Sequence, residues 1–108
     1  MTHTLAQLTV MVSEVSDTYA SRNDIVRDAD WYLLKVQEEL GELTAEYLKT
    51  TGRGRLKGAD VAAVRTAMED ETADVLAMLL LFADNNGIDL EAALARKWFQ
   101  HLGRSSTA

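Results

Sequence analysis

Two short acidic motifs hold the residues whose types and spacing are best suited to chemistry. The first is EELGE at residues 38–42, and the second is ETAD at residues 71–74. Because each residue of an α-helix turns about 100°, acids three positions apart lie on one face. If both segments are helical and pack antiparallel, four carboxylates meet in one place: Glu39, Glu42, Glu71 and Asp74. Glu38 lies four residues before Glu42 and reaches the same cluster from the other side.

Such a cluster needs compensation because its charges repel one another. Two carboxylates about 5 Å apart repel by roughly 3 kcal/mol at an effective dielectric near 20. Four carboxylates hold several such pairs, and the sum rivals the roughly 5–15 kcal/mol stability of a small domain. Either protons return to the acids and raise their pKa values, or a cation binds among them. Ligation by carboxylates alone favours Mg²⁺ or Mn²⁺ over Zn²⁺. The sequence therefore indicates a site for Mg²⁺ or Mn²⁺.

These acids have two other interpretations. Glutamate is a good helix former, so a single EExxE arises commonly by chance on a solvated helix face. The second acidic pair lies on an otherwise apolar helix, and this pairing favours a site over a solvated face. A di-iron carboxylate bundle requires Glu-x-x-His pairs. Neither His3 nor His101 follows a glutamate at that spacing, which argues against di-iron chemistry.

Composition limits the classes of protein to which the chain belongs. Its 108 residues suit one domain, covering residues 1–108. The net charge of -6 argues against nucleic acid and anionic membranes as partners. The longest apolar run, residues 75–83, is far shorter than the roughly 20 residues of a membrane-spanning helix. The first fifteen residues lack a basic start followed by a cleavable apolar run, so we expect a cytoplasmic protein.

The elements that must position the acids are helices. Proline is absent, and apolar residues recur at steps of three and four. The pattern predicts a first helix from Leu5 with a break at residues 21–23, and a second from near residues 24–30 to about Lys49. Asp60 and Asp89 are the expected N-caps of two more helices, which run to about Asn85 and roughly Leu102. The glycine-rich stretch at residues 50–58 reads as an exposed loop.

The third helix is apolar around its whole circumference between residues 75 and 82. A helix of this kind must be surrounded by other elements. Three sister helices cannot easily surround it in so short a chain. We therefore expect it to lie centrally and to pack against a second subunit; the alternative is an imperfectly shielded helix in a monomer.

The paired acidic motifs resemble the EExxE…ExxD motif of the MazG-like, all-α nucleoside triphosphate pyrophosphohydrolases. The likeness extends into the surrounding segments KVQEELGELTAEYL and EDETADVLAMLLLFADNNGIDLEAALARKW, and it covers roughly residues 25–104. The paired motif is fairly specific, whereas either half alone is weak. The resemblance implies an all-α, four-helix MazG-like bundle that is completed by dimerisation, in a homodimer or homotetramer whose neighbouring subunits complete each site.

The resemblance also implies roles for individual residues. Glu39, Glu42, Glu71 and Asp74 would ligate Mg²⁺, and Glu38 would orient or deprotonate the attacking water. Lys97 and Arg104 would contact the triphosphate, although cations near a helix C-terminus are also explained by the helix dipole. Between them the family often carries asparagine, where this chain has His101. That departure leaves the sugar or phosphate contact at this position open.

The activity implied is hydrolysis of a nucleoside triphosphate between its α and β phosphates, giving the monophosphate and pyrophosphate in nucleotide-pool clean-up. No GxxxxGK[ST] motif is present, which argues against ordinary ATPase mechanics. The enzymatic alternative is a phosphoribosyl-ATP pyrophosphohydrolase, and the other is a non-enzymatic helical dimerisation or adaptor module. The basic loop residues Arg53, Arg55 and Lys57 either close over phosphates or stay solvated. Trp31 and Trp98 either stack on a base or belong to the core.

Overall fold

The structure, a computed structural model, describes residues 2–54, 58 and 60–103 and is helical. Its elements are α1 (Leu5–Asn23), α2 (Ala29–Thr50), α3 (Val61–Asn85), α4 (Leu90–Lys97) and the short 3-10 helix η1 (Phe99–His101). The described residues contain no strand, so the prediction of an all-α chain is confirmed. None of the helices within these residues is long and apolar enough to cross a membrane.

Helices α2, α3 and α4 begin where the sequence predicts, because an aspartate side chain caps each of them. The side chains of Asp28, Asp60 and Asp89 accept hydrogen bonds from the backbone N–H groups of Trp31, Ala63 and Ala92. Each satisfies an N–H group that has no partner inside the helix. The predicted caps of α3 and α4 are therefore confirmed.

Two helix ends differ from the prediction. Residues 21–23 belong to α1, which ends at Asn23 and is followed by its C-cap Asp24, a residue in the left-handed region with φ of 53°. Aspartate tolerates this conformation better than most residues. The regular part of α4 ends at Lys97 rather than near Leu102, and the chain continues as η1. This short helix has no buried residue, so little packing sustains its last turn.

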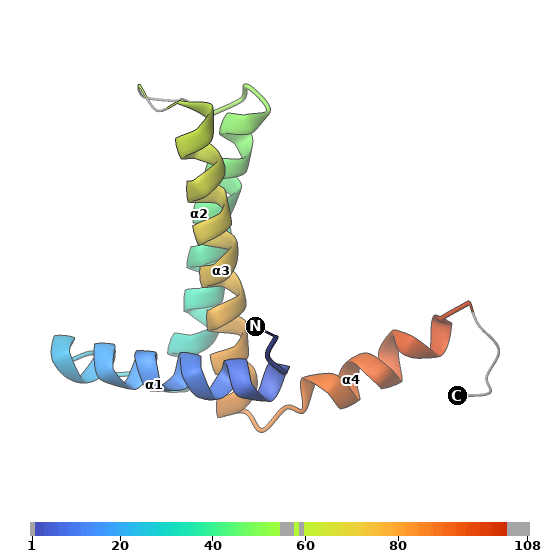
Figure 1. Ribbon diagram of the computed structural model, residues 1–108. Coiled ribbons are helices and arrows are strands. Elements are labelled where there is room, and N and C mark those ends of the chain that lie inside the picture. Colours follow the sequence, from blue (N-terminus) through green and yellow to red (C-terminus); the bar gives the residue numbers. More distant parts are fainter. Residues whose placement is uncertain (1, 55–57, 59, 104–108) are drawn as a thin grey trace.

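The long antiparallel pair α2 and α3 is the centre of the molecule (Figure 1). Helix α1 crosses the lower end of this pair and packs against α3 (Figure 1). Most of the buried apolar side chains belong to α3: Val64, Leu80, Leu81 and Ala83. The predicted central position of the third helix is therefore confirmed.

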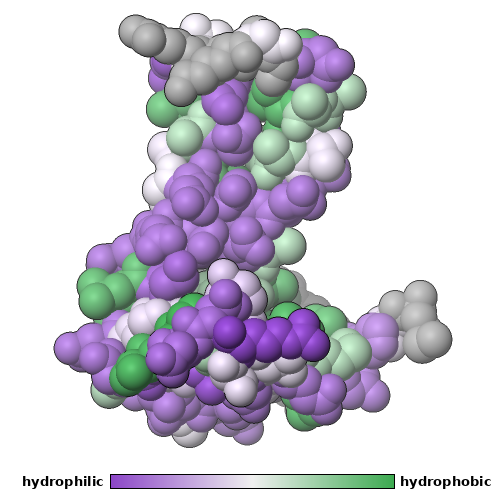
Figure 2. Space-filling model, turned by 90° about the vertical axis from the view of Figure 1, so that its left-hand side faces the viewer, coloured by the Kyte–Doolittle hydropathy of each residue, from purple (hydrophilic) through white to green (hydrophobic). Residues whose placement is uncertain are grey.

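The single chain is more open than a compact domain of its length. Its radius of gyration is 17.1 Å, whereas about 13 Å is typical of 108 residues. Its accessible surface is 8266 Å², against about 6,000 Å² for a folded monomer of this mass. Helix α4 points away from the helix pair (Figure 1), and apolar residues are exposed along the pair and around α1 (Figure 2). The described residues thus form no closed four-helix bundle within one chain.

Candidate metal centre

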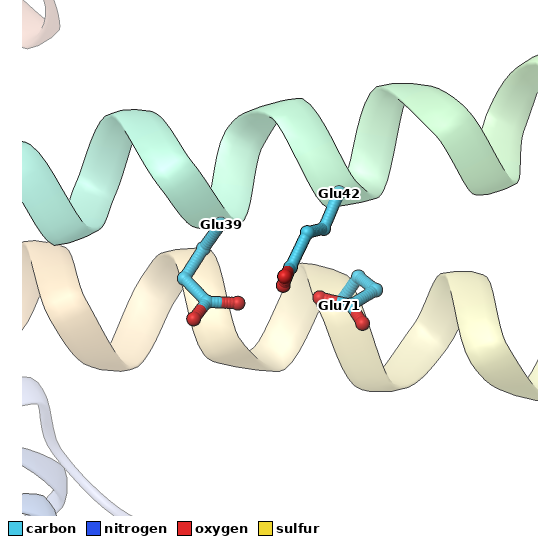
Figure 3. Close-up of side chains that lie close together, drawn as sticks. All are labelled: Glu39, Glu42 and Glu71. Atoms are coloured by element: carbon cyan, nitrogen blue, oxygen red, sulfur yellow. The ribbon is translucent and has the colours of Figure 1, made fainter.

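The packing of α2 against α3 brings three of the predicted acids together. Glu39 and Glu42 lie three residues apart on α2, and Glu71 faces them from α3 (Figure 3). Each offers one carboxylate oxygen, and these three oxygens all lie within 4.8 Å of one another. We call these residues the acidic trio. The antiparallel arrangement that the sequence required for such a cluster is present.

Part of the trio is withdrawn from solvent. Glu39 is the one buried charged residue in the described part of the chain, at 8% exposure, and Glu71 is half-buried. Atoms Oε2 of Glu39 and Oε2 of Glu71 are buried and have no hydrogen-bond partner. A buried polar atom without a partner is costly, and an ionised one more so. Two carboxylate oxygens at this interface are therefore free to bind a ligand.

Burial and neighbouring charges shift the pKa values of two residues of the trio, Glu39 and Glu71. Burial, followed by the carboxylates of Glu42 and Asp74, raises the pKa of Glu39 to about 7, against the charge of Lys35. Burial also raises the pKa of Glu71, followed by the negative charge of Glu42. Without a cation, the charged forms of Glu39 and Glu71 are disfavoured, and Glu39 takes up a proton near neutral pH.

Asp74 lies beside the trio but is not part of it. It is exposed, one turn further along α3 than Glu71, and its charge raises the pKa values of both Glu39 and Glu71. An aspartate side chain is one methylene shorter than glutamate, which is consistent with its position at the margin. Three of the four predicted ligands thus converge, and metal ligation by any of the four stays a prediction.

Lys35 is a neighbour of the trio that the sequence analysis did not single out. Its Nζ lies 2.8 Å from Glu38 Oε1 and 3.8 Å from Glu39 Oε1. The hydrogen bond to Glu38 raises the pKa of Lys35 and keeps its ammonium charged. The only available signal was its spacing, three and four residues before two acids of the motif. Glu38 itself is exposed and held at the edge of the cluster by this pair.

A cavity of about 660 Å³ lies between α1, α2 and α3 and adjoins the trio. Glu39 and Asp74 form an acidic part of its wall, whereas most of the remainder is apolar. Trp31 lines it, so that this ring is neither fully exposed nor buried in a core. Trp98, by contrast, is 65% exposed and belongs to no core within one chain. A cavity of this size accommodates a small organic ligand beside the carboxylates.

Lys97 is the one predicted phosphate-binding cation within the described residues, and it is not near the trio in one chain. Lys97 is exposed at the end of α4, on the side of the molecule that points away from the helix pair (Figure 1). His101 is exposed in η1, and Arg53 is exposed with its Nε 3.1 Å from Thr51 Oγ1. Arg104, Arg55 and Lys57 lie outside the described residues. Within one chain, the acidic trio therefore has no contribution from Lys97.

Comparisons of the chain with protein-family models, with curated proteins and with solved structures found no match. The fold and the site themselves define an all-helical protein with clustered carboxylates between two antiparallel helices.

Proposed function

We propose that this chain is a Mg²⁺-dependent nucleoside triphosphate pyrophosphohydrolase, which cleaves between the α and β phosphates to give a monophosphate and pyrophosphate. One observation carries the proposal: three carboxylates from two helices converge within 4.8 Å, and two of their oxygens are buried without partners. An all-oxygen donor set of this kind fits a hard divalent cation. The paired EELGE and ETAD motifs add the resemblance to MazG-like enzymes and, with it, nucleotide-pool clean-up in the cytoplasm.

The residues of the trio would hold the ion, with Asp74 as the nearest further acid. A bound Mg²⁺ supplies positive charge that offsets the phosphate oxygens and lowers the pKa of water. In this proposal Glu38 orients the attacking water and accepts its proton. Its position at the edge of the cluster supports this role, because Glu38 is exposed there and lies outside the trio.

The nucleoside is proposed to occupy the cavity beside the trio. The acidic wall of this cavity, Glu39 and Asp74, would face the phosphates through the ion, and the apolar wall would face the base. Trp31 presents an aromatic ring in that wall, which is suited to stacking on a planar base. The cavity volume of about 660 Å³ lies within the usual range of small-molecule sites, roughly 300–1,000 Å³.

A second copy of the chain is proposed to complete a MazG-like bundle, in a homodimer or homotetramer. The accessible surface of 8266 Å² exceeds that of a compact monomer by about 2,000 Å², which is comparable with what a chain buries in an obligate dimer. Exposed apolar side chains occur on every helix, among them Val15, Leu34, Leu79 and Leu94. In such an assembly, α4 of one copy would bring Lys97 and Arg104 to the trio of the other.

The proposal is tested by pyrophosphate release from a panel of nucleoside triphosphates, with phosphoribosyl-ATP included, in the presence of Mg²⁺ or a chelator. We expect release with Mg²⁺ and none with the chelator. Turnover of phosphoribosyl-ATP alone would instead identify the enzyme of that substrate. A non-enzymatic dimerisation module is the second candidate, favoured by the exposed apolar surface, and it would release no pyrophosphate from any member of the panel.

A further inference from the structure

Lys35 lies at the junction between the acidic trio and the cavity. Its side chain belongs to the cavity wall and is 25% exposed. Its Nζ lies 2.8 Å from Glu38 Oε1, 3.8 Å from Glu39 Oε1 and 5.9 Å from the centroid of the Trp31 ring. One ammonium group therefore contacts the motif, the buried carboxylate and an aromatic wall of the cavity.

At this position, the charge of Lys35 has opposite effects in the absence and in the presence of a metal ion. In the absence of a metal ion, its charge offsets part of the negative charge of Glu39. A divalent cation held by Glu39 would be only a few ångströms from the ammonium, and the two positive charges would repel. A fixed ammonium would therefore weaken ion binding. Lysine has a flexible stem with four methylene groups, which allows its charge to move away from the carboxylate.

The cavity offers the ammonium another partner. A phosphate group that enters it and approaches the trio brings negative charge close to Nζ. Hydrogen bonds from an ammonium to phosphate oxygens are charge-assisted and stronger than those between neutral groups. The Trp31 ring contacts the ammonium only through a weak cation–π interaction. The ammonium can therefore move from the carboxylates to a phosphate group.

We infer that Lys35 is a counter-ion that changes partners: it neutralises Glu38 and Glu39 in the metal-free protein, and it binds the phosphate of the ligand when the metal ion is present. This inference rests on the proposed function and adds to it a phosphate-binding residue outside the EELGE motif. It also explains how one chain supplies a phosphate-binding cation although Lys97 lies elsewhere.

The test is the variant Lys35→Met, which removes the charge and keeps an unbranched stem. Mn²⁺ affinity is measured by calorimetry without phosphate, and the affinity for inorganic triphosphate is measured at saturating Mg²⁺. We expect Mn²⁺ to bind about tenfold more tightly, because a neighbouring positive charge is gone. We expect triphosphate to bind about tenfold more weakly. Lys35→Arg keeps the charge, so both affinities should stay within about threefold of the wild type.

Lys49→Met is the matched control. Lys49 lies on the same helix and forms a pair of the same spacing, with its Nζ 2.8 Å from Glu46 Oε2 and its side chain 22% exposed. It is not part of the cavity wall, so neither affinity should change. An unchanged Mn²⁺ affinity in Lys35→Met, or a loss of both affinities together, overturns the inference alone. A wild-type protein that binds no Mn²⁺ overturns the proposed function and this inference with it.

Discussion

Glu39 on α2 and Glu71 on α3 each direct one carboxylate oxygen into the interface between the two helices, and neither of these buried oxygens has a hydrogen-bond partner. Two like charges at such a place reduce the stability of the folded chain unless a proton or a cation joins them. The pKa of about 7 for Glu39 places this choice near neutral pH. Protonation and ion binding are therefore competing ways to stabilise the same pair.

The first prediction concerns stability and pH in the metal-free protein. The pKa of Glu39 rises from 4.5 to about 7 on folding, so the folded state holds the proton more tightly than the unfolded state. Below about pH 4.5, Glu39 is protonated in both states and does not lower the free energy of unfolding. As the pH rises from there through about 7, the free energy of unfolding falls. Once Glu39 is ionised in the folded state, the total loss in the free energy of unfolding is about 3 kcal/mol. Glu39→Gln should therefore be more stable than the wild type at pH 8 and no more stable at pH 4.

Urea denaturation at several pH values, with a chelator present, measures this difference. Glu14→Gln serves as the control because Glu14 is an exposed glutamate on α1. It should change stability by less than about 0.5 kcal/mol at either pH. A Glu39→Gln variant that is less stable than the wild type at pH 8 would contradict the prediction.

The second prediction concerns Mg²⁺ and thermal unfolding. Only the folded chain gathers the acidic trio, so an ion that binds it stabilises the folded state by about 2.7 kcal/mol at one hundred times its Kd. Differential scanning calorimetry should show a Tm increase of several degrees at pH 8. The increase should shrink at pH 5, where protons occupy Glu39. Glu71→Gln should abolish most of it, and an equal increase in that variant would be incompatible with the site.

The third prediction separates the base from the ligands. Glu38→Gln should lower kcat for pyrophosphate release by about 10²–10⁴-fold, because a positioned general base contributes that much. Its Mn²⁺ affinity should stay within about threefold of the wild type, since Glu38 lies outside the trio. Glu39→Gln should lose both turnover and Mn²⁺ binding. Equal losses of Mn²⁺ affinity in the two variants would refute the division of roles.

The fourth prediction concerns assembly. Leu79 on the central helix is 40% exposed in one chain, where a partner is proposed to cover it. Leu79→Glu should shift the protein from a dimer or tetramer towards the 11.9 kDa monomer, because a charge at an apolar interface is strongly disfavoured. Sedimentation equilibrium measures the mass. Thr66→Glu, at an exposed polar position of the same helix, should leave the mass unchanged. A wild-type protein that sediments as a monomer would rule out the proposed assembly.

The sequence predicted the elements better than their arrangement. The N-caps Asp60 and Asp89 could be recognised because a short polar side chain before an apolar run has a local effect. The helical spacing likewise brought Glu39, Glu42 and Glu71 to one interface. The end of α4 could not be predicted, since it depends on packing that this helix lacks within one chain. The positions of Asp74 and Lys35 depend on side-chain length and on the neighbouring helix. The helical periodicity of the sequence does not predict either of these.

The most direct test of the central claim is a crystal structure of the protein grown with Mn²⁺ at pH 8, analysed for anomalous scattering. The account predicts a Mn²⁺ peak between Glu39, Glu42 and Glu71, with carboxylate oxygens at about 2.2 Å. A structure in which these three side chains lie apart, or in which Mn²⁺ occupies other acids while the trio stays empty, would contradict it.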